Sequence, residues 1–322
     1  MTQSHDLLHE LSVELGISSR DLTHIITSAP RRYKIYEIPK RNGGTRVIAQ
    51  PARDLKILQR YLLDTKLHQF PVHPAATAYV QRKNIAFNAR LHTESSFILK
   101  LDFENFFPSI KVADWEVIAR KSKLKFSRRD LAICNHIMFW GAGSPEPRCL
   151  SIGAPTSPAL SNIVMFRIDE RLNEAASNFD VTYSRYADDI TISGEDRDSI
   201  LRFEKFSRAL IEKARSPKLT FNDEKRGLYG KGQRRMVTGL LITPDQRVSI
   251  GRDRKRLISV MLHKVSLGVA DAEHVGRLKG LLGFCLATEP SFVSVMRTKY
   301  GNRVVDQVLR AEVPKRVRSD IK

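Results

Sequence analysis

The sequence lacks several features that would place it in common protein classes. It has 3 cysteines among 322 residues, widely spaced and without a CxxC pair, which argues against a disulfide framework and a structural zinc site. No stretch approaches the roughly 18 consecutive apolar residues of a membrane helix. Residues 1–15 carry acidic side chains and no basic start before an apolar run, unlike a secretory signal. We therefore expect a cytoplasmic protein with no membrane partner.

Acidic residues are scarce relative to basic ones. The chain has 54 Lys plus Arg against 35 Asp plus Glu, a formal charge of +19. Most of the excess lies in residues 225–322, which hold 21 basic and 8 acidic residues, against 33 and 27 in residues 1–224. Such a surface most often binds a phosphate backbone, because neutralised phosphates release condensed counterions. A solvated face that promotes solubility is the alternative.

Local patterns predict an α+β chain that can bury a core, since 42% of its residues are hydrophobic. Period-two alternation on both sides of residues 42–44 predicts a first β-hairpin, and apolar density predicts a buried strand over residues 97–103. A second hairpin is expected over residues 181–193 and a third over 236–250. Helices are predicted over residues 7–15, 18–26, 54–68, 113–139, 203–214, 252–267, 271–287 and 290–309, with a short strand over 218–222.

A longer helix is expected to begin at Ser157, because Ser followed by Pro is a favourable cap and first-turn pair. Its apolar stripe includes Leu160 and Leu172, and Asp169 is expected on the outward face.

The sharpest local signal is the pair Asp188 and Asp189 within the stretch YADD at residues 186–189. Adjacent carboxylates repel each other unless a cation shares their charge, although an exposed Asp-Asp turn is common. Asp102 ends a separate buried strand and can approach this hairpin tip if the strands are sheet neighbours. Three carboxylates without His or Cys suit Mg²⁺, which also binds phosphate oxygens. Two such ions about 3.5 to 4 Å apart can activate a hydroxyl and stabilise leaving pyrophosphate, so we expect nucleotidyl transfer.

Four motifs in this order resemble the palm motifs of reverse transcriptases: LDFENFFPS around Asp102, IGAPTSPALSN from Ile152, YADD, and FNDEKRG around Lys225. NAxxH at residues 88–92 and VTG at residues 237–239 are similar to elements of the bacterial retron reverse transcriptases. The resemblance covers residue 31 to the end of the basic tail. The chain departs from it at Ile152, where the family usually has Gln, which leaves open one polar contact near the nucleotide sugar.

The resemblance implies a right-hand polymerase fold: a helical lead-in over residues 1–30, fingers over 31–96 with part of 113–150, a palm over 97–250 and a basic helical thumb over 251–322. It implies an RNA-directed DNA polymerase that uses dNTPs and two Mg²⁺ ions. For retrons it further implies a dedicated structured noncoding RNA as template and primer, synthesis from an internal 2′-hydroxyl, and branched RNA-linked DNA (msDNA). A role in antiphage defence with a separate effector protein is implied as well.

The same resemblance assigns roles to single residues. Asp102, Asp188 and Asp189 correspond to the metal-binding catalytic triad, and Phe107 to the aromatic steric gate, with a core Phe as the alternative. Residues implied to bind the dNTP triphosphate are Lys40 or Arg41, Arg46, and Lys225, with an ordinary surface lysine as the alternative for Lys225. Residues implied to contact RNA or DNA are Asn88, His92, Val237, Thr238, Gly239, Arg254 and Arg256, with a structural role for His92 and a plain turn at residues 238–239 left open. Rival functions are a group II intron type of reverse transcriptase and a nucleic-acid scaffold with an idle site.

Overall fold

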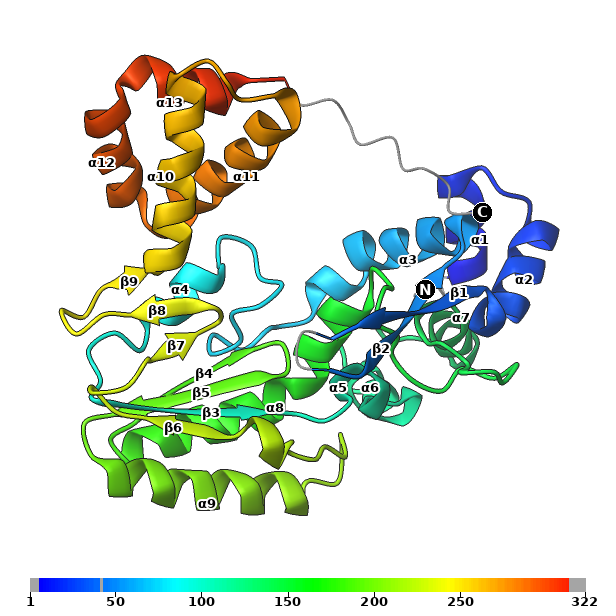
Figure 1. Ribbon diagram of the computed structural model, residues 1–322. Coiled ribbons are helices and arrows are strands. Elements are labelled where there is room, and N and C mark those ends of the chain that lie inside the picture. Colours follow the sequence, from blue (N-terminus) through cyan, green and yellow to red (C-terminus); the bar gives the residue numbers. More distant parts are fainter. Residues whose placement is uncertain (1–5, 41–42, 313–322) are drawn as a thin grey trace. The chain divides into compact units, whose positions relative to one another are not determined.

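The computed structural model describes residues 6–40 and 43–312, a chain of helices and small β-sheets (Figure 1). The described residues pack as two units, each assembled from segments far apart in sequence. Unit 1 comprises the described residues up to 82 together with residues 99–228, and unit 2 comprises residues 83–98 and the described residues from 229 onward. Arg41, the alternative to Lys40 at the tip of the first hairpin, lies outside the described residues.

A four-stranded sheet with the strand order β4-β5-β3-β6 forms the centre of unit 1. β4 (Thr182–Tyr186) and β5 (Asp189–Gly194) are an antiparallel hairpin in which Tyr186 pairs with Asp189. β3 (Phe97–Asp102) lies beside β5, and β6 (Gly227–Tyr229) follows it. The predicted strand that carries Asp102 is thus a sheet neighbour of the YADD hairpin.

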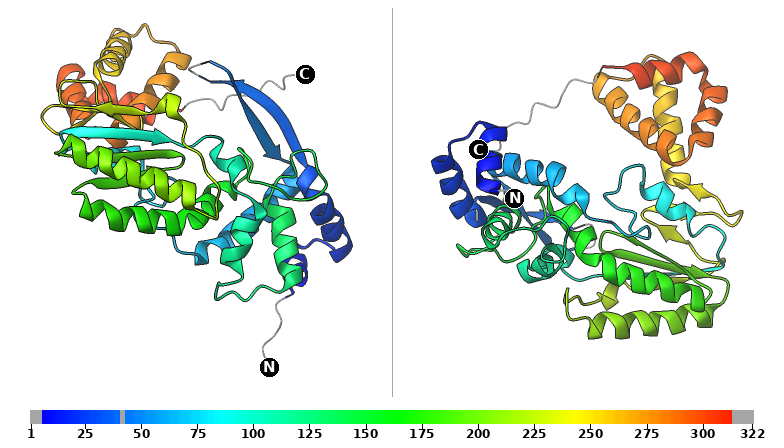
Figure 2. Two further views of the ribbon diagram at one scale, coloured as in Figure 1. Left: turned by 90° about the horizontal axis from the view of Figure 1, so that it is seen from below. Right: turned by 180° about the vertical axis from the view of Figure 1, so that it is seen from behind.

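Two helices, α8 (Ser157–Asn178) and α9 (Arg197–Lys213), cover one face of this sheet (Figures 1 and 2). Buried Leu172, Ile192 and Phe203 fill the layer between helices and strands. Because this layer is packed from both sides, it gives the sheet and its turns a rigid base.

The first hairpin of the chain and several helices complete unit 1. β1 (Tyr33–Pro39) pairs with β2 (Thr45–Pro51), as predicted, and Ile38 lies opposite Arg46. A helical group beside this hairpin is held by the ion pair of Lys66 with Glu10 at 2.6 Å. The helices are α1 (Leu7–Leu15), α2 (Ser19–Ser28), α3 (Arg53–Thr65), α5 (Phe106–Ser109), α6 (Val112–Ala119) and α7 (Arg128–Met138), with 3-10 turns η1 (Ala29–Arg31), η2 (Leu67–Gln69) and η3 (Asp223–Lys225).

Three local predictions were wrong. The single helix over residues 113–139 is two helices, because Lys125 has a left-handed φ of 48° and Ser127 with Asp130 forms a capping box that starts a new one. Residues 218–222 are not a strand but make one isolated bridge, from Phe221 to Phe103. Ser157 does not cap α8, which begins after Thr156 without a side-chain cap.

Unit 2 is a helical bundle joined to a small sheet. α4 (Ile85–Arg90) packs against the sheet of β7 (Met236–Val237), β8 (Leu240–Ile242) and β9 (Val248–Ser249). The bundle consists of α10 (Arg252–Ser266), α11 (Ala272–Thr288), α12 (Pro290–Tyr300) and α13 (Asn302–Arg310), close to the predicted helices and broken at Gly301 as predicted. Throughout the described part of the chain, no helix combines the length and apolar character that crossing a membrane would need.

Candidate active site

The three predicted carboxylates lie at one edge of the central sheet of unit 1. Asp102 is the last residue of β3, Asp189 is the first residue of β5, and Asp188 stands in the turn before β5. The N–H group of Phe103 donates to the carbonyl of Asp188 at 3.2 Å, which ties the end of β3 to this turn. The structure therefore brings together side chains that lie eighty-six residues apart in sequence.

The turn that carries Asp188 contains Ala187 at a left-handed φ of 59°. Only two residues separate the paired Tyr186 and Asp189, so the chain must reverse tightly here. A non-glycine residue in this region is strained and persists only when its surroundings hold it.

Charge is crowded at this edge of the sheet. Burial raises the pKa of Asp188, and the negative charge of Asp102 raises it further, while Lys225 and Arg46 oppose the shift. Burial also raises the pKa of Asp189 to about 7, with hydrogen bonding to Asp102 and the charge of Asp188 as further causes. Two carboxyl groups with raised pKa values indicate a site where negative charge is costly without a cation.

Lys225 supplies one positive charge directly. Its Nζ lies 2.7 Å from Oδ1 of the buried Asp102. Asn222 places it there: the Asn222 N–H donates to the carbonyl of Asp102 at 2.8 Å, and the Asn222 side chain accepts from the N–H of Glu224 at 3.1 Å. The motif around Lys225 is thus folded against the end of β3, and the exposed Lys225 forms an ion pair with Asp102.

Asp102, Asp188 and Asp189 offer carboxylate oxygens, the ligand chemistry that a divalent cation of the Mg²⁺ type prefers. Such an ion prefers oxygen ligands and is commonly bound by one or two carboxylates together with substrate phosphates. Within residues 6–40 and 43–312, no group of three or more His, Cys, Asp or Glu side chains is gathered closely enough to hold a metal ion by itself. A cation held by Asp102, Asp188 and Asp189 would therefore complete its ligand shell with oxygen atoms of a nucleotide or of water.

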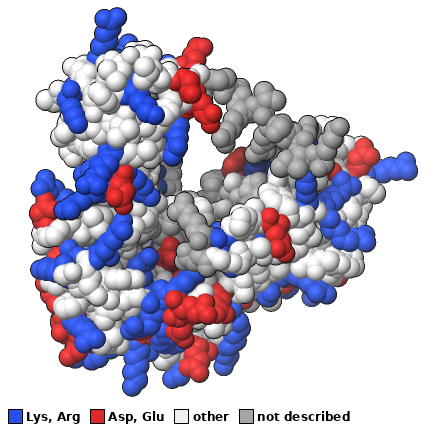
Figure 3. Space-filling view, in the orientation of Figure 1, with Lys and Arg blue, Asp and Glu red and all other residues white. Residues whose placement is uncertain are grey.

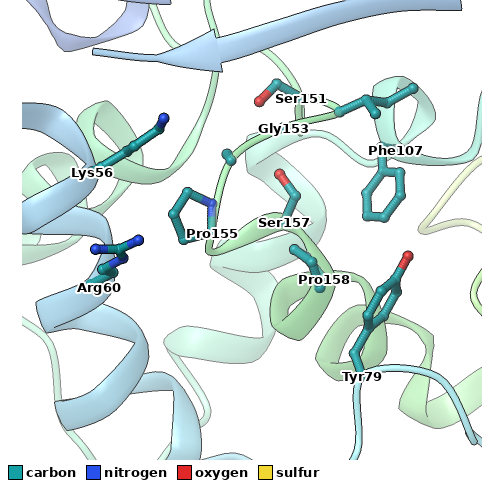
Figure 4. A pocket seen from close by; sticks show the side chains of 11 residues that line it. Lys56, Arg60, Tyr79, Phe107, Ser151, Gly153, Pro155, Ser157 and Pro158 are labelled. Atoms are coloured by element: carbon teal, nitrogen blue, oxygen red, sulfur yellow. The ribbon is translucent and has the colours of Figure 1, made fainter. Parts of the chain in front are cut away.

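A cavity of about 380 Å³ opens beside Phe107 in unit 1 (Figure 4). Lys56 and Arg60 of α3 line one side of it, and Phe107 and Tyr79 line the other. Its remaining lining is the loop and first turn of α8: Ser151, Ile152, Gly153, Ala154, Pro155, Ser157 and Pro158. The aromatic rings can contact a base or sugar, and the cations can contact phosphate.

Buried hydroxyl groups in the same loop have no hydrogen-bond partner. The Oγ atom of Ser157 and the Oγ1 atom of Thr156 are buried and unpaired, and Ser157 lines the cavity (Figure 4). Buried polar groups without partners cost free energy and mark positions where a ligand or water supplies the missing bond. Phe107 belongs to this cavity, whereas the buried Phe106 beside it belongs to the core.

The loop before α8 is anchored to the first hairpin. The Ala49 N–H donates to the carbonyl of Ile152 at 3.0 Å, so the backbone of Ile152 docks on β2. Gly153 follows with a φ of +123°, and a Cβ there would lie 3.1 Å from the carbonyl oxygen of Ala49. Glycine is required at this position both by its backbone conformation and by the close approach of the two segments.

Gly153→Ala should therefore reduce catalytic efficiency. The strain of about 1–3 kcal/mol would push the loop away from β2 and displace the hydroxyls that line the cavity. We expect kcat/KM for dNTP incorporation to fall by about tenfold, measured by primer extension. The control is Gly232→Ala, because a Cβ at Gly232 meets no atom within 4 Å. Equal activity of both variants would show that the Gly153 loop does not shape the site.

The first hairpin presents two of the predicted triphosphate ligands, Lys40 and Arg46. The Lys40 N–H donates to the carbonyl of Gly44 at 2.9 Å and closes the hairpin end, so Lys40 follows β1 directly. Arg46 lies on β2 and is one of the charges that act on Asp188 and Tyr79. Arg46 thus shares the electrostatic environment of the carboxylates.

The predicted RNA-contacting residues lie in unit 2, and several are buried. Asn88, His92 and Val237 have no exposed surface, so these side chains cannot contact RNA directly in this arrangement. Thr238, at a left-handed φ of 47°, donates its hydroxyl to the carbonyl of Ile85 at 2.9 Å. NAxxH and VTG therefore build one structural element, in which the turn of the β7–β8 hairpin is bonded to α4.

Two arginines at the start of α10 differ in their contacts. Arg254 donates to the carbonyl of Gly239 at 3.2 Å and lies 5.5 Å from the ring centroid of Phe284. Arg256 is exposed. Among the charged side chains on the visible face of unit 2, Lys and Arg cover more of the surface than Asp and Glu (Figure 3). Arg254 therefore supports the VTG turn, while Arg256 is available to a phosphate.

The burial of His92 should make the stability of the protein depend on pH. Burial lowers its pKa from 6.5 to about 3, so the folded protein holds it neutral. The unfolded chain binds a proton below about pH 6.5. Stability from this residue is therefore complete above pH 6.5 and is lost as the pH falls towards 3. Relative to pH 7, the wild type should lose about 2 kcal/mol of unfolding free energy at pH 5 that His92→Gln does not lose.

Denaturant unfolding at both pH values measures this difference. His9→Gln is the control, because His9 is exposed. If the wild type and His92→Gln lose the same free energy between pH 7 and pH 5, His92 is not held neutral by burial.

Sequence reasoning missed a buried network beneath the YADD turn. Asp169, expected on the outward face of α8, has no exposed surface, and neither has Arg185. Asn162 and Asp169 are seven residues apart, two helical turns, and so share one face of α8. That spacing is a signal that could have indicated an inward polar pair.

Several known proteins that are similar to this chain are reverse transcriptases. The family described as "Reverse transcriptase (RNA-dependent DNA polymerase)" matches residues 38–239. Retron Ec83 reverse transcriptase from Escherichia coli is 35% identical over 91% of this chain and 92% of its own length. Retron Ec86 reverse transcriptase, also from Escherichia coli, is 30% identical over 93% of this chain and 92% of its own length. Retron Mx65 reverse transcriptase from Myxococcus xanthus is 31% identical over 87% of this chain and 68% of its own length.

Proposed function

This chain belongs to the reverse transcriptase family and, within it, to the retron reverse transcriptases, and from this premise we propose how its residues divide the work of DNA synthesis. The activity is RNA-directed DNA polymerisation on a right-hand polymerase fold, as the sequence predicts. The family uses divalent metal ions and nucleic acid partners. The observation that carries the assignment to single residues is the meeting of Asp102, Asp188, Asp189 and Lys225 at one edge of a rigid sheet.

We assign the domains as the sequence analysis does. The sheet of β3 to β6 with α8 and α9 supports a palm within residues 97–250, and the β1–β2 hairpin supports fingers within residues 31–96 with part of 113–150. The basic bundle supports a thumb over residues 251–322, preceded in the chain by the VTG strands that pack into the same unit. Residues 1–30 form the lead-in, whose described helices pack on α7.

The triad Asp102, Asp188 and Asp189 would hold two Mg²⁺ ions. Bound there, the ions would lower the pKa of the primer hydroxyl and stabilise the leaving pyrophosphate. Lys225 contacts Asp102, and from this position its ammonium group would meet the triphosphate and donate a proton to the leaving pyrophosphate. Lys40 and Arg46 engage phosphate oxygens from the hairpin.

The cavity beside Phe107 would receive the sugar of the incoming nucleotide and the facing template residue. A ring beneath the sugar leaves no room for a 2′-hydroxyl, which selects dNTPs. Lys56 and Arg60 would contact template phosphate from α3.

We further propose that the template and primer are a dedicated structured noncoding RNA, and that synthesis starts from an internal 2′-hydroxyl to give msDNA. The retron names of the relatives support this step. A separate effector protein and a role in antiphage defence belong to the same proposal.

Sequencing the nucleic acid that copurifies with the protein, before and after treatment with debranching enzyme, tests the proposal. DNA joined to RNA by a 2′,5′ bond is expected, so debranching should release a free DNA end. A DNA product unaffected by debranching would leave a general reverse transcriptase, such as a group II intron type. Failure to incorporate dNTPs with Mg²⁺ on any primer would leave an idle scaffold.

A substitution in the VTG turn tests the retron-specific part of this proposal. Thr238→Val removes the hydroxyl that joins the turn to Ile85. We expect synthesis on the cognate RNA to fall by about tenfold, with extension of a generic annealed primer changed much less, because unit 2 would present its RNA-binding surface less accurately.

Arg256→Ala is the companion variant, since Arg256 is exposed. It should weaken binding to both templates and reduce the salt slope of binding by about 1, as expected of a single phosphate contact. Equal losses on both templates for Thr238→Val would contradict a retron-specific role of the turn.

A further inference from the structure

A fully buried ion pair in unit 1 adjoins the YADD turn. Arg185 and Asp169 are both fully buried and form a two-point ion pair, Nε to Oδ1 at 2.8 Å and Nη2 to Oδ2 at 2.6 Å. A buried ion pair is costly to desolvate, and apolar residues of similar volume often stabilise a core as well or better. Stability alone therefore does not account for this pair.

The guanidinium of Arg185 reaches the strained turn itself. Its Nη1 donates to the carbonyl of Ala187 at 3.0 Å. Ala187 is the left-handed residue immediately before Asp188, so this bond acts on the peptide group that orients the first turn carboxylate. The contact is between a rigid planar donor and a backbone acceptor, and it fixes position more closely than a flexible lysine could.

The same guanidinium also reaches the loop that carries Tyr79. Its Nη2 donates to Oδ1 of Asn162 at 3.1 Å, and Nδ2 of Asn162 donates to the carbonyl of Ala78 at 2.9 Å. Tyr79 follows with a left-handed φ of 61° and lines the cavity with Phe107, the two ring centroids 6.4 Å apart. Two strained residues on separate segments are thus attached to one buried side chain.

We propose that Arg185, anchored by Asp169 and linked through Asn162, is a positioning residue that holds the Asp188 turn and the Tyr79 wall of the nucleotide cavity in a constant relation. The inference rests on the proposed active site. Backbone hydrogen bonds of Arg185 with Ala75 and Thr77, at 2.9 and 2.8 Å, already join β4 to the loop before Tyr79. The Arg185 side chain extends this connection to Ala187 and, through Asn162, to Ala78, which are next to or at the two strained positions. Without these side-chain bonds the strain at Ala187 and at Tyr79 would lose its support, and the distance between the carboxylates and the bound nucleotide would vary. Arg185 itself touches neither metal nor nucleotide.

The test compares Arg185→Lys with Tyr183→Phe. Lysine keeps the positive charge beside Asp169 but lacks the fork that also reaches Ala187 and Asn162. Tyr183 donates to Oδ1 of Asp169 at 2.8 Å, so Tyr183→Phe removes a bond from the same buried carboxylate without touching either turn. Both variants are assayed well below their unfolding temperatures, for kcat and KM of a dNTP and for Mn²⁺ binding by electron paramagnetic resonance.

We expect Arg185→Lys to lower kcat by about tenfold to a hundredfold and to weaken Mn²⁺ binding by about fivefold, while Tyr183→Phe changes neither by more than about twofold. A purely structural role would lower the unfolding temperature of both variants and leave kcat and Mn²⁺ affinity of the folded protein unchanged. That result would overturn the proposal, while loss of activity in Asp188→Asn together with normal activity in Arg185→Lys would leave the proposed function intact.

A second variant covers the case in which Arg185→Lys does not fold. The triple substitution Tyr183→Phe, Asp169→Leu and Arg185→Met replaces the ionic group with apolar side chains and leaves no buried charge unpaired. It should fold and show the same loss of kcat and Mn²⁺ affinity. Normal kinetics in the triple variant, or failure of both variants to fold, would overturn the proposal, since the network would then serve folding alone.

Discussion

Asp188→Asn is expected to abolish DNA synthesis, with kcat reduced by about a thousandfold or more. The substitution keeps the shape of the side chain but removes the charge that a divalent cation requires. Asp102→Asn should have the same effect, because Asp102 lies at the end of β3 beside the turn. Primer extension with Mg²⁺ and dNTPs measures both variants.

The loss should occur without loss of folding. Burial and the charge of Asp102 raise the pKa of Asp188, so the ionised carboxylate is disfavoured in the folded state. A group whose pKa is raised on folding costs stability above that pKa, and a neutral amide removes this cost. We therefore expect the unfolding temperature of Asp188→Asn without metal to equal or exceed that of the wild type at pH 8.

The exposed Asp198 on the first turn of α9 gives a matched control. Asp198→Asn removes the same charge outside the triad and should leave extension unchanged. Near-normal synthesis by both Asp102→Asn and Asp188→Asn would exclude the triad as the metal site.

The sequence alone predicted the central geometry because its signals are local and strong. A dense apolar strand that ends in Asp102 and a hairpin that carries Asp188 and Asp189 each have a clear pattern. Only their adjacency had to be inferred, and the strand order β4-β5-β3-β6 confirms it. The hairpin over residues 33–50 and the helices after residue 251 were predicted for the same reason.

Buried polar residues could not be predicted in this way. Asp169 is a charged residue of the kind usually found at exposed helix positions. Its burial depends on Arg185, which lies sixteen residues away on a strand. Likewise, Thr238 meets Ile85 across 153 residues, so no local pattern shows that the VTG turn is bonded to α4. In both cases the deciding contact is tertiary, and single-residue polarity points to the wrong environment.

Phe107→Val is the second substitution from which a large effect is expected. Phe107 lines the cavity beside Tyr79, whereas its neighbour Phe106 is 3% exposed and packs in the core. Removing the ring opens space beneath the sugar, so a 2′-hydroxyl can be accommodated. The preference for dNTP over rNTP, as a ratio of kcat/KM values, should fall by about a hundredfold, mainly through faster rNTP incorporation.

Phe107→Tyr is the matched control for this experiment. It keeps a ring of the same width beneath the sugar and should retain the preference for dNTPs, although it adds a hydroxyl to the ring that lines the cavity with Tyr79. Steady-state kinetics with one nucleotide at a time on an annealed RNA template separates the two variants. If folded Phe107→Val discriminates as strongly as Phe107→Tyr, the ring is a packing residue and the sugar is selected elsewhere in the site. Tyrosine preserves the steric block but makes the surface beneath the sugar more polar. If Phe107→Val and Phe107→Tyr both lose the preference for dNTPs, the apolar contact of the ring with the sugar therefore contributes more to selection than the width of the ring.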